Sequence, residues 1–319
     1  MARKDEKQMK IALIGSGKYS FAIASLLLQK ANKLTMWTHD KTFTLPESYQ
    51  KKIDLETDLT KVIQENNIIF LLISSSYVET TFKDLPKNLF KNKLLIIGTK
   101  GLLPYKPYYI SKYLRKQKHI RNLIYFAGPN LASDLEHLFP TSMTFAITKK
   151  RQINQIKNLF PDFISAHFTY LFEPIELAST LKNIYAIGSG ILEAKYHSQS
   201  TTFAYLSKAY DECLSILDQI ANYTKYMRDF KYIPLDITGD FFLTGTMSES
   251  RNKKYGTLMY NKEAKAKYEQ ENTIEGLINL PNVYKLLKKR KVKAPLFYTL
   301  YQIIFQEKDP NTLEEVTFH

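Results

Sequence analysis

The sequence predicts an α/β protein in which a doubly wound, mostly parallel sheet domain is followed by an all-α domain. Over the first half of the 319 residues, short β-rich runs alternate with helical patterns, which is typical of βαβ units. The run IIFLLI at 68–73 is apolar throughout, as expected for a strand that helices cover on both faces. After Glu173-Pro174, long helical patterns dominate. We therefore predict two domains, residues 1–173 and residues 174–319.

Each element is predicted from a short pattern. Runs rich in Val, Ile, Leu, Phe and Tyr predict strands, and segments with apolar residues three or four positions apart predict helices. The expected strands are 10–14, 34–38, 68–73, 94–97, 123–127, 143–147 and 167–170. The expected helices of the first domain are 19–30, 59–65, 77–85, 131–138 and 152–159. In the second domain we expect long helices at 175–194, 201–227 and 294–306.

The composition excludes several classes of protein. Hydrophobic residues make up 44% of the chain and charged residues 24%, as in ordinary globular domains. Cys213 is the only cysteine, so we expect no disulfide framework, no metal site and a reducing, cytoplasmic location. The charged N-terminus and the short apolar runs predict neither a secretory signal peptide nor a membrane span.

The net charge is strongly positive, at +14 from 45 basic and 31 acidic residues. Such a charge is compatible with nucleic acid, an anionic membrane surface or phosphorylated small molecules as partners. The lysines are spread along the chain, and no arm or single helix holds most of them. We therefore expect no nucleic-acid partner, and we treat the charge as compatible with an anionic substrate but not as evidence for one.

A glycine-containing turn follows the first predicted strand. Gly15-Ser16-Gly17 lies between that strand and the helical segment FAIASLLLQK. Glycines at such a turn let the backbone approach a pyrophosphate, and the N-terminus of the next helix offers N–H groups to it. Ser20 stands where the usual fingerprint has its third glycine, and it is small enough to be tolerated. The context predicts a Rossmann-type site for NAD or NADP.

The end of the second predicted strand bears on which dinucleotide binds, because residues at this point usually contact the adenosine ribose. Asp40 would accept a hydrogen bond from a 2′-hydroxyl and favour NAD, whereas His39 or Lys41 would face a 2′-phosphate. All three are also consistent with a solvated turn. The choice between NAD and NADP therefore stays open.

Five further motifs occur in a fixed order along the chain. They are TKGL at 99–102, AGPNLA at 127–132, LKN at 181–183, GDFFLT at 239–244 and SRNKKYG at 250–256. In this order and at these separations, the set resembles the bacterial NAD(P)-dependent glycerol-3-phosphate dehydrogenases, which have TKGL, GPSxA, LKN, GDLxxT and SRNRxxG. The resemblance extends from Lys10 to Pro310.

The resemblance implies an oxidoreductase that transfers a hydride between NAD(P)H and dihydroxyacetone phosphate, supplying sn-glycerol 3-phosphate for phospholipid synthesis. We also expect a cytoplasmic location and a small phosphorylated substrate. A homodimer is the assembly that fits this expectation. Two alternatives stay open. One is a related two-domain dehydrogenase that acts on a hydroxyacid or another phosphorylated polyol, and the other is a catalytically silent dinucleotide-binding protein.

Alcohol oxidation requires a group that takes the hydroxyl proton and returns it in the reverse reaction. Lys182 suits this role because it lies in an otherwise apolar helical pattern, where desolvation lowers the pKa of an ammonium. A lysine that reaches from the helix to solvent is the alternative. By resemblance, Lys100 would polarise the carbonyl oxygen and Asp240 would position Lys182. A turn lysine and a helix N-cap are the respective alternatives.

Phosphate recognition is predicted at Ser250-Arg251-Asn252, which offers a hydroxyl, a guanidinium fork and an amide in succession. Three consecutive side chains scatter around a helix axis, so we expect this segment at a helix start. The resemblance adds to the substrate-binding residues Lys100, Gly128, Asn130, Lys182 and Asp240. For the cofactor it implies Gly15, Gly17, Lys18, Tyr19, His39, Lys100, Ala132, Arg251, Thr273 and Glu275.

Five segments depart from the family pattern. Tyr19-Ser20 replaces Trp or Phe followed by glycine, His39 replaces a cofactor-binding arginine, and Asn130 replaces a serine. Ile237-Thr238 replaces Gly-Leu, and the segment SQST at 198–201 replaces GDNT. The change at His39 leaves a preference for NADPH open. None of these replacements removes a group that the chemistry requires.

Overall fold

The computed structural model describes residues 9–221 and 235–319, and these form two compact units. Unit 1 contains the described residues up to 99 together with 111–126 and 130–170. Unit 2 contains 100–110, 127–129 and the described residues from 171 to 319. The predicted domain boundary between residues 173 and 174 stays a prediction, and two short segments ahead of it also belong to unit 2.

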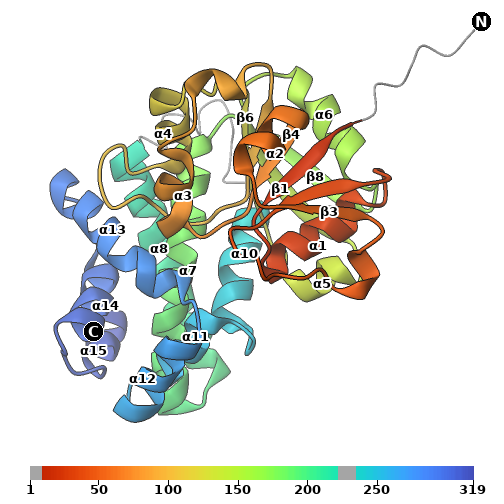
Figure 1. Cartoon of the computed structure of the whole chain (residues 1–319). Coiled ribbons are helices and arrows are strands. Elements are labelled where there is room, and N and C mark those ends of the chain that lie inside the picture. Colours follow the sequence, from red (N-terminus) through yellow and green to blue (C-terminus); the bar gives the residue numbers. More distant parts are fainter. Residues whose placement is uncertain (1–8, 222–234) are drawn as a thin grey trace, which may run out of the picture. The chain divides into compact units, whose positions relative to one another are not determined.

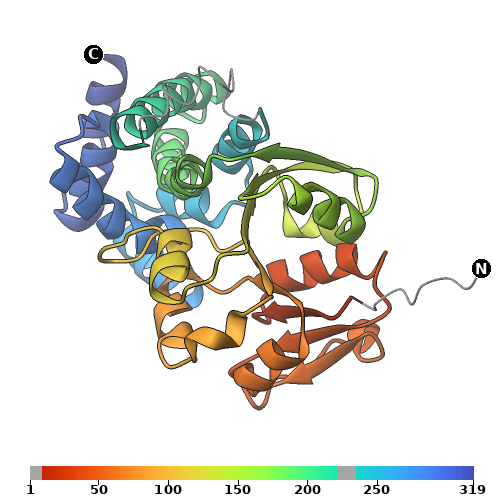
Figure 2. The same cartoon turned by 90° about the horizontal axis from the view of Figure 1, so that it is seen from above.

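Unit 1 is built around an eight-stranded sheet (Figures 1 and 2) with the order β3-β2-β1-β4-β5-β6-β7-β8. All seven predicted strands are present. The missed strand is β3, whose four residues IDLE alternate apolar and charged positions too briefly to stand out. The bounds are β1 (Ile11–Ile14), β2 (Leu34–Trp37), β3 (Ile53–Glu56), β4 (Ile68–Leu71), β5 (Leu94–Ile97), β6 (Leu123–Ala127), β7 (Thr141–Ile147) and β8 (Ile164–Thr169).

The sheet is parallel except at one edge. Strands β1 to β6 pair in parallel, and β7 and β8 are parallel to each other. Gln152 follows the end of β7, and its Nε2 donates to the carbonyl oxygen of Leu123, at the start of β6, at 3.0 Å. The end of β7 therefore lies beside the start of β6, so the last two strands run antiparallel to the other six. The predicted doubly wound, mostly parallel sheet is confirmed.

Helices cover both faces of the sheet (Figure 2), because right-handed crossovers change face where the strand order reverses next to β1. The helices on one face share an apolar core cluster with the strands. They are α1 (Lys18–Leu27), α5 (Ala132–Glu136) and α6 (Arg151–Leu159). On the other face lie α2 (Leu59–Glu65), α3 (Ser75–Phe82) and α4 (Ile110–Gln117). The five predicted helices are present, whereas α4 was missed because its segment ISKYLRKQ is rich in Lys and Arg.

Unit 2 is a set of helices packed around α7 (Phe172–Tyr196), as Figure 1 shows. Nearly all of α7 is buried, because several other helices pack directly against it. The remaining helices of this unit are α8 (Gln199–Ala221), α10 (Leu235–Thr246), α11 (Arg251–Thr257), α12 (Lys262–Glu271), α13 (Glu275–Arg290), α14 (Pro295–Phe305) and α15 (Thr312–Phe318).

The predicted all-α character of the second half is confirmed. The helices expected at 175–194 and 294–306 are present. The helix expected at 201–227 is present as far as Ala221, and residues 222–227 lie outside the described residues. Within the two described ranges, no helix combines the length and the apolar character that crossing a bilayer demands.

Helices α7 and α11 cross at two glycines. A Cβ atom on Gly256 would lie 2.0 Å from the carbonyl oxygen of Ile187, and one on Gly190 would lie 2.0 Å from the carbonyl oxygen of Lys253. Only glycine allows backbones to approach this closely. The crossing therefore fixes the start of α11, which carries the predicted phosphate-binding residues, against the helix that carries Lys182.

Candidate active site

The glycine turn after β1 has the geometry of a dinucleotide site. Gly15 has a φ of 125°, and a Cβ atom there would lie 3.0 Å from the carbonyl oxygen of Leu72, so this position requires glycine. Gly17 is the N-cap of α1, and no side chain caps that helix. A Cβ atom on Gly17 would meet no atom within 4 Å. The turn therefore keeps the space in front of the first turn of α1 clear of side chains, as a pyrophosphate needs.

A pocket of about 580 Å³ lies beside this turn, and its lining includes the predicted cofactor residues Gly15, Gly17 and His39. Helix α3 and the residue before it contribute one wall of this pocket, which we did not predict from the sequence. The available signal was the polar run SSSY soon after β4, at the carboxyl edge of the sheet, where α/β folds bind ligands. The residues of that wall are Ser74, Tyr77, Thr80 and Thr81.

The other cofactor predictions of unit 1 lie at helix starts. Lys18 and Tyr19 are the first residues of α1, and Ala132 is the first residue of α5. The two helices pack side by side, and the Tyr19 ring stacks on Phe126 with 6.4 Å between centroids. Both helices begin at the carboxyl edge of the sheet, so all three residues lie on the same edge as the glycine turn.

The ribose-side candidates His39 and Asp40 have different environments. His39 lines the pocket. The Oδ1 atom of Asp40 accepts hydrogen bonds from Oγ1 and from the backbone N–H of Thr42, at 2.7 and 2.8 Å. These bonds hold the pKa of the Asp40 carboxyl below its usual value. One Asp40 oxygen is thus occupied by a local turn, whereas His39 forms part of the pocket lining.

Two predicted substrate residues come from the turn after β6. Gly128 has a φ of 155°, which favours glycine. Asn130 is buried, and neither its Oδ1 nor its Nδ2 has a hydrogen-bond partner in the described part of the chain. A buried amide without partners is rare in folded proteins. Asn130 therefore has both a donor and an acceptor available for a ligand.

In unit 2, a buried ion pair joins α7 and α10. The Lys182 Nζ donates to Oδ1 of Asp240, and each side chain is only 4% exposed. The Oδ2 atom of Asp240 has no partner among the described residues. The surface-lysine alternative for Lys182 is wrong because the side chain is buried. The N-cap alternative for Asp240 is wrong because it lies in the middle of α10.

The environment of Lys182 lowers its pKa to about 7. Burial is the largest cause, because it penalises the ammonium form, and the nearby positive charge of Lys100 acts in the same direction. The negative charge of Asp240 acts in the opposite direction. The structure therefore brings Lys100, Lys182 and Asp240 together, and it gives Lys182 a pKa at which it can both donate and accept a proton near neutral pH.

The loop that carries Lys100 is anchored by residues that the sequence analysis missed. Asn279 accepts a hydrogen bond from the Leu102 N–H at 2.8 Å, and Asn282 donates to the Leu102 carbonyl at 2.9 Å. At the far end of the loop, the buried carboxylate of Glu176 accepts from the Ile110 N–H. These contacts span 66 to 180 residues of sequence. The only local signals were polar residues within apolar helical patterns.

The segment Ser250-Arg251-Asn252 lies at a helix start, as predicted. Ser250 is the N-cap of α11, and its Oγ accepts from the Lys253 N–H at 3.4 Å. Arg251 is exposed.

Asn252 is buried at the meeting point of three helices. Its Nδ2 donates to Oδ1 of Asn183 at 3.1 Å, and its Oδ1 accepts from the Gly276 N–H at 2.8 Å. Asn252 therefore joins α11 to α7 and to α13. Of the three predicted phosphate ligands, Arg251 is the one whose side chain extends to the surface.

The remaining cofactor predictions of unit 2 lie where α13 begins. Thr273 is exposed just before this helix, and Glu275 is its first residue. Glu275 Oε2 accepts from the Asn279 side chain at 3.4 Å. Glu275 is therefore partly tied to the residue that anchors the Lys100 loop.

Comparisons with known proteins give family matches over most of the chain. The family model of the NAD-dependent glycerol-3-phosphate dehydrogenase N-terminus matches residues 10–153, and that of the C-terminus matches residues 173–315. A glycerol-3-phosphate dehydrogenase (NAD(P)+) of Clostridium botulinum strain Eklund 17B is 24% identical, over 94% of this chain and 94% of the relative. One of Orientia tsutsugamushi strain Boryong is 26% identical, over 93% of both chains.

Solved structures share the fold along its whole length. The structure of glycerol-3-phosphate dehydrogenase from Coxiella burnetii matches with a TM-score of 0.85 and 21% identity, over 98% of this chain and 99% of the other. That of Plasmodium falciparum glycerol-3-phosphate dehydrogenase matches with a TM-score of 0.77 and 18% identity, over 97% and 95%.

Proposed function

Because this chain belongs to the NAD-dependent glycerol-3-phosphate dehydrogenase family, we propose that it interconverts dihydroxyacetone phosphate and sn-glycerol 3-phosphate with NAD(P)H or NAD(P)+. The observation that carries the proposal is the buried Lys182, whose Nζ is paired with Asp240 beside Lys100. When bound, the nicotinamide supplies or accepts the hydride. What the protein must add is a proton at the reacting oxygen, and Lys182 is the group suited to move it.

Lys182 acts as the general acid in the reduction and as the general base in the oxidation. Its pKa of about 7 keeps both protonation states accessible near neutral pH, which is the optimum for a catalytic acid–base group. Lys100 contributes a second positive charge where negative charge develops on the oxygen. Asp240 positions the Lys182 ammonium through their hydrogen bond.

Unit 1 binds the dinucleotide in the pocket beside the glycine turn. The residues fit such a ligand because Gly17 leaves space for a pyrophosphate and α1 has no side-chain cap. We assign the ribose side to His39, which lines the pocket. The further contacts proposed for the cofactor are those of Lys18, Tyr19, Lys100, Ala132, Arg251, Thr273 and Glu275.

Arg251 anchors the substrate phosphate. Its guanidinium fork matches a phosphate group, and it forms no ion pair with any carboxylate of the described residues. Ser250 and Asn130 add polar contacts to the substrate. Asn252 acts mainly by positioning the start of α11, because its side chain already bonds to Asn183 and Gly276.

Oxidation of NADH and of NADPH by dihydroxyacetone phosphate tests the reaction directly. Arg251→Lys should raise the KM for this substrate, since an ammonium cannot reproduce the bidentate fork, and Arg251→Ala should raise it further. Activity on unphosphorylated dihydroxyacetone should barely change in either variant. Arg290→Ala, which removes another exposed arginine of unit 2, is the matched control and should leave the KM unchanged.

Two outcomes would contradict the proposal. A wild-type enzyme that oxidises neither cofactor with dihydroxyacetone phosphate would overturn the activity. Equal losses on both substrates in Arg251→Ala, in a protein of normal thermal stability, would overturn only the phosphate assignment and would favour a hydroxyacid or another polyol.

The family also supports a cytoplasmic location and a homodimer as proposals. Light scattering coupled to size-exclusion chromatography measures the assembly. A mass near twice that of the 37.1 kDa chain would support the dimer, and a mass near 37.1 kDa would contradict it.

A further inference from the structure

We infer that a second pocket of unit 1 binds a small anion that carries several phosphate groups. The pocket has a volume of about 770 Å³, which is large enough for a nucleotide-sized molecule. Its twelve lining residues include no Asp or Glu. Six of them are Lys or Arg: Lys87, Lys91, Lys93, Arg121, Lys149 and Arg151.

This pocket is distinct from the dinucleotide pocket. Lys93 comes just before β5 and Asn122 just before β6, so the pocket lies at the amino edge of the parallel strands. The glycine turn follows the end of β1 and lies at the opposite, carboxyl edge. No residue lines both pockets. A ligand in the basic pocket is therefore neither the dinucleotide of the first pocket nor its pyrophosphate.

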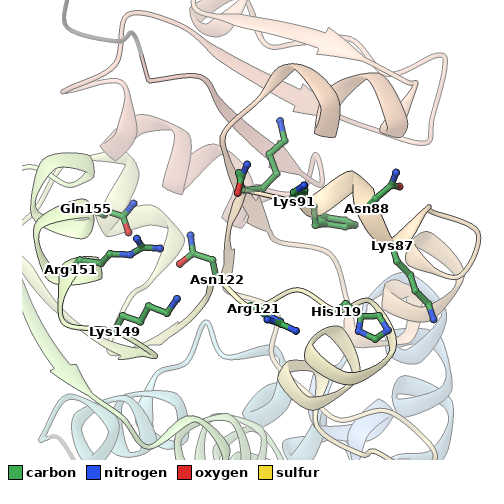
Figure 3. A pocket seen from close by; sticks show the side chains of 12 residues that line it. Lys87, Asn88, Lys91, His119, Arg121, Asn122, Lys149, Arg151 and Gln155 are labelled. Atoms are coloured by element: carbon green, nitrogen blue, oxygen red, sulfur yellow. The ribbon is translucent and has the colours of Figure 1, made fainter. Parts of the chain in front are cut away.

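The basic side chains come from three separate segments, as Figure 3 shows. Lys87 and Lys91 lie in and just after the short helix η2 (Lys87–Phe90), and Arg121 precedes β6. Lys149 and Arg151 extend from the turn after β7 towards Asn122. Because the three segments are far apart in sequence, the fold itself creates the concentration of charge.

A buried glutamine holds two of these segments together. Gln152 is fully buried, and its Oε1 accepts from the N–H groups of Thr148 and Lys149 at 2.7 and 3.0 Å. Its Nε2 donates to Oδ1 of Asn122 and to the carbonyl of Leu123, both at 3.0 Å. The turn that presents Lys149 and Arg151 is thus fixed next to Asn122, and the pocket is formed before any ligand arrives.

The charges of the pocket are not neutralised by the protein. None of the six basic side chains forms an ion pair with a carboxylate in ranges 9–221 and 235–319. Lys93 bonds to the Gln64 carbonyl oxygen at 2.7 Å, which leaves its charge uncompensated. Like charges held together repel one another, so a multivalent anion would relieve this repulsion. Arg121 and Arg151 add guanidinium forks that match phosphate oxygens.

The lining favours a small polyphosphate over nucleic acid. Single strands are usually bound by a basic groove combined with exposed aromatic rings on which bases stack. Here the only rings in the lining are those of Phe90, which is 4% exposed, and His119. The pocket therefore offers charge and hydrogen-bond donors but no stacking platform.

Isothermal titration calorimetry with inorganic tripolyphosphate tests the inference. The full chain is saturated with NADH beforehand, so that the pyrophosphate site is occupied. We expect saturable binding of one tripolyphosphate, and we expect the double variant Arg121→Glu/Arg151→Glu to weaken it at least ~10-fold, because two charge-assisted contacts become repulsive. The matched control Lys51→Glu/Lys52→Glu makes the same charge change at exposed positions of unit 1 and should change the affinity by less than about twofold at physiological salt.

Three results would overturn the inference. One is no saturable binding to the wild-type protein, and another is equal weakening in both double variants, which would show only a general effect of net charge. The third is tighter binding of a single-stranded DNA 12-mer that Arg121→Glu/Arg151→Glu also abolishes, which would identify a nucleic-acid surface. Thermal melting of each variant confirms that the fold is retained, and the single variant Arg121→Glu replaces the double variant if the latter does not fold.

Discussion

The two units build functional surfaces in opposite ways. In the described part of unit 1, Lys118 is the only Asp, Glu, Lys or Arg side chain that is buried, whereas unit 2 buries Glu176, Lys182, Glu212, Asp236, Asp240 and Lys253. Unit 1 lines its dinucleotide pocket with residues that include no Asp, Glu, Lys or Arg, which suffices for a ligand that brings its own charge to a helix N-terminus. Unit 2 removes ionisable groups from water, and for Lys182 this burial lowers the pKa, which suits proton transfer.

The largest effect that the comparison predicts is at Lys182. Lys182→Ala should lower kcat by ~10²–10⁴-fold, the usual contribution of a general acid–base group, while NADH binding measured by fluorescence titration stays unchanged. Lys195→Ala, on the same helix, is the matched control, because Lys195 also pairs with a carboxylate, Glu314, but is 31% exposed. A Lys182→Ala enzyme that keeps more than about a tenth of the wild-type rate, a loss of only ~1.4 kcal/mol, would exclude the proton-transfer role.

The next largest effects are predicted at two glycines, one in each unit. Gly256 allows close helix packing in unit 2, and Gly17 leaves space for a ligand in unit 1. Gly256→Ala would place a Cβ atom 2.0 Å from the Ile187 carbonyl oxygen, so the free energy of unfolding should fall by about 3 kcal/mol. Gly17→Val should cost much less stability, because a Cβ atom there meets nothing within 4 Å, although valine is a poorer N-cap than glycine.

Cofactor binding should respond in the reverse order. Gly17→Val should weaken NADH binding about tenfold or more, equivalent to ~1.4 kcal/mol, because the valine side chain occupies the pyrophosphate space. Denaturant unfolding and cofactor titration on both variants measure the four quantities. If Gly17→Val bound NADH normally in a folded protein, the pyrophosphate would have to lie elsewhere.

The pH dependence of the rate tests the proposed role of the buried Lys182–Asp240 pair in proton transfer, and the expected changes are smaller. In the reduction, Lys182 must start protonated, so kcat/KM should fall about tenfold per pH unit above a pKa of about 7. In the oxidation it must start neutral, so the rate should rise with pH up to that value and then level off.

Asp240→Asn removes the charge that raises this pKa and should move the inflection to lower pH. Lys100→Met removes a charge that lowers it and should move the inflection to higher pH. If neither variant moved the inflection of the pH profile, Lys182 would not be the group that titrates.

The fold of unit 1 could be predicted because its signals are local. Strand β5 and helix α2 were predicted with their observed bounds, since each is a short apolar or amphipathic run between clear breaks. Strand β3 was missed because pairing with β2, rather than its own composition, holds four weakly patterned residues in place. The glycine turn was predictable for the same reason as β5, because the strand, turn and helix are contiguous.

The site of unit 2 could be predicted only in part. Burial of Lys182 follows from the apolar pattern around it, but the partner Asp240 lies 58 residues away and was assigned by resemblance. The contacts of Asn279 and Asn282 with Leu102 span 177 and 180 residues, so no local pattern reveals them. The basic pocket escaped prediction in the same way, because its lysines and arginines are scattered in the sequence and gathered only by the sheet.

The smallest predicted effect concerns a buried polar group in unit 1 that belongs neither to the dinucleotide pocket nor to a buried ion pair. Ser20 is fully buried in α1, and its Oγ has no hydrogen-bond partner among the described residues. A buried hydroxyl without a partner destabilises the fold, and alanine is also the better helix former. Ser20→Ala should therefore raise the free energy of unfolding by about 1 kcal/mol.

Ser25 on the same helix is the matched control for Ser20. Its Oγ donates to the Phe21 carbonyl at 3.1 Å and bonds to the Tyr49 hydroxyl at 2.7 Å. Ser25→Ala should therefore lower the free energy of unfolding by about 1 kcal/mol, the net value of a typical hydrogen bond. Urea denaturation of the two variants measures both changes, and the opposite signs make the comparison robust against errors common to both. A Ser20→Ala protein that is less stable than the wild type would contradict this prediction. It would mean that the Ser20 hydroxyl has a hydrogen-bond partner in solution, and that a side-chain hydrogen bond helps to hold α1 in place behind the glycine turn.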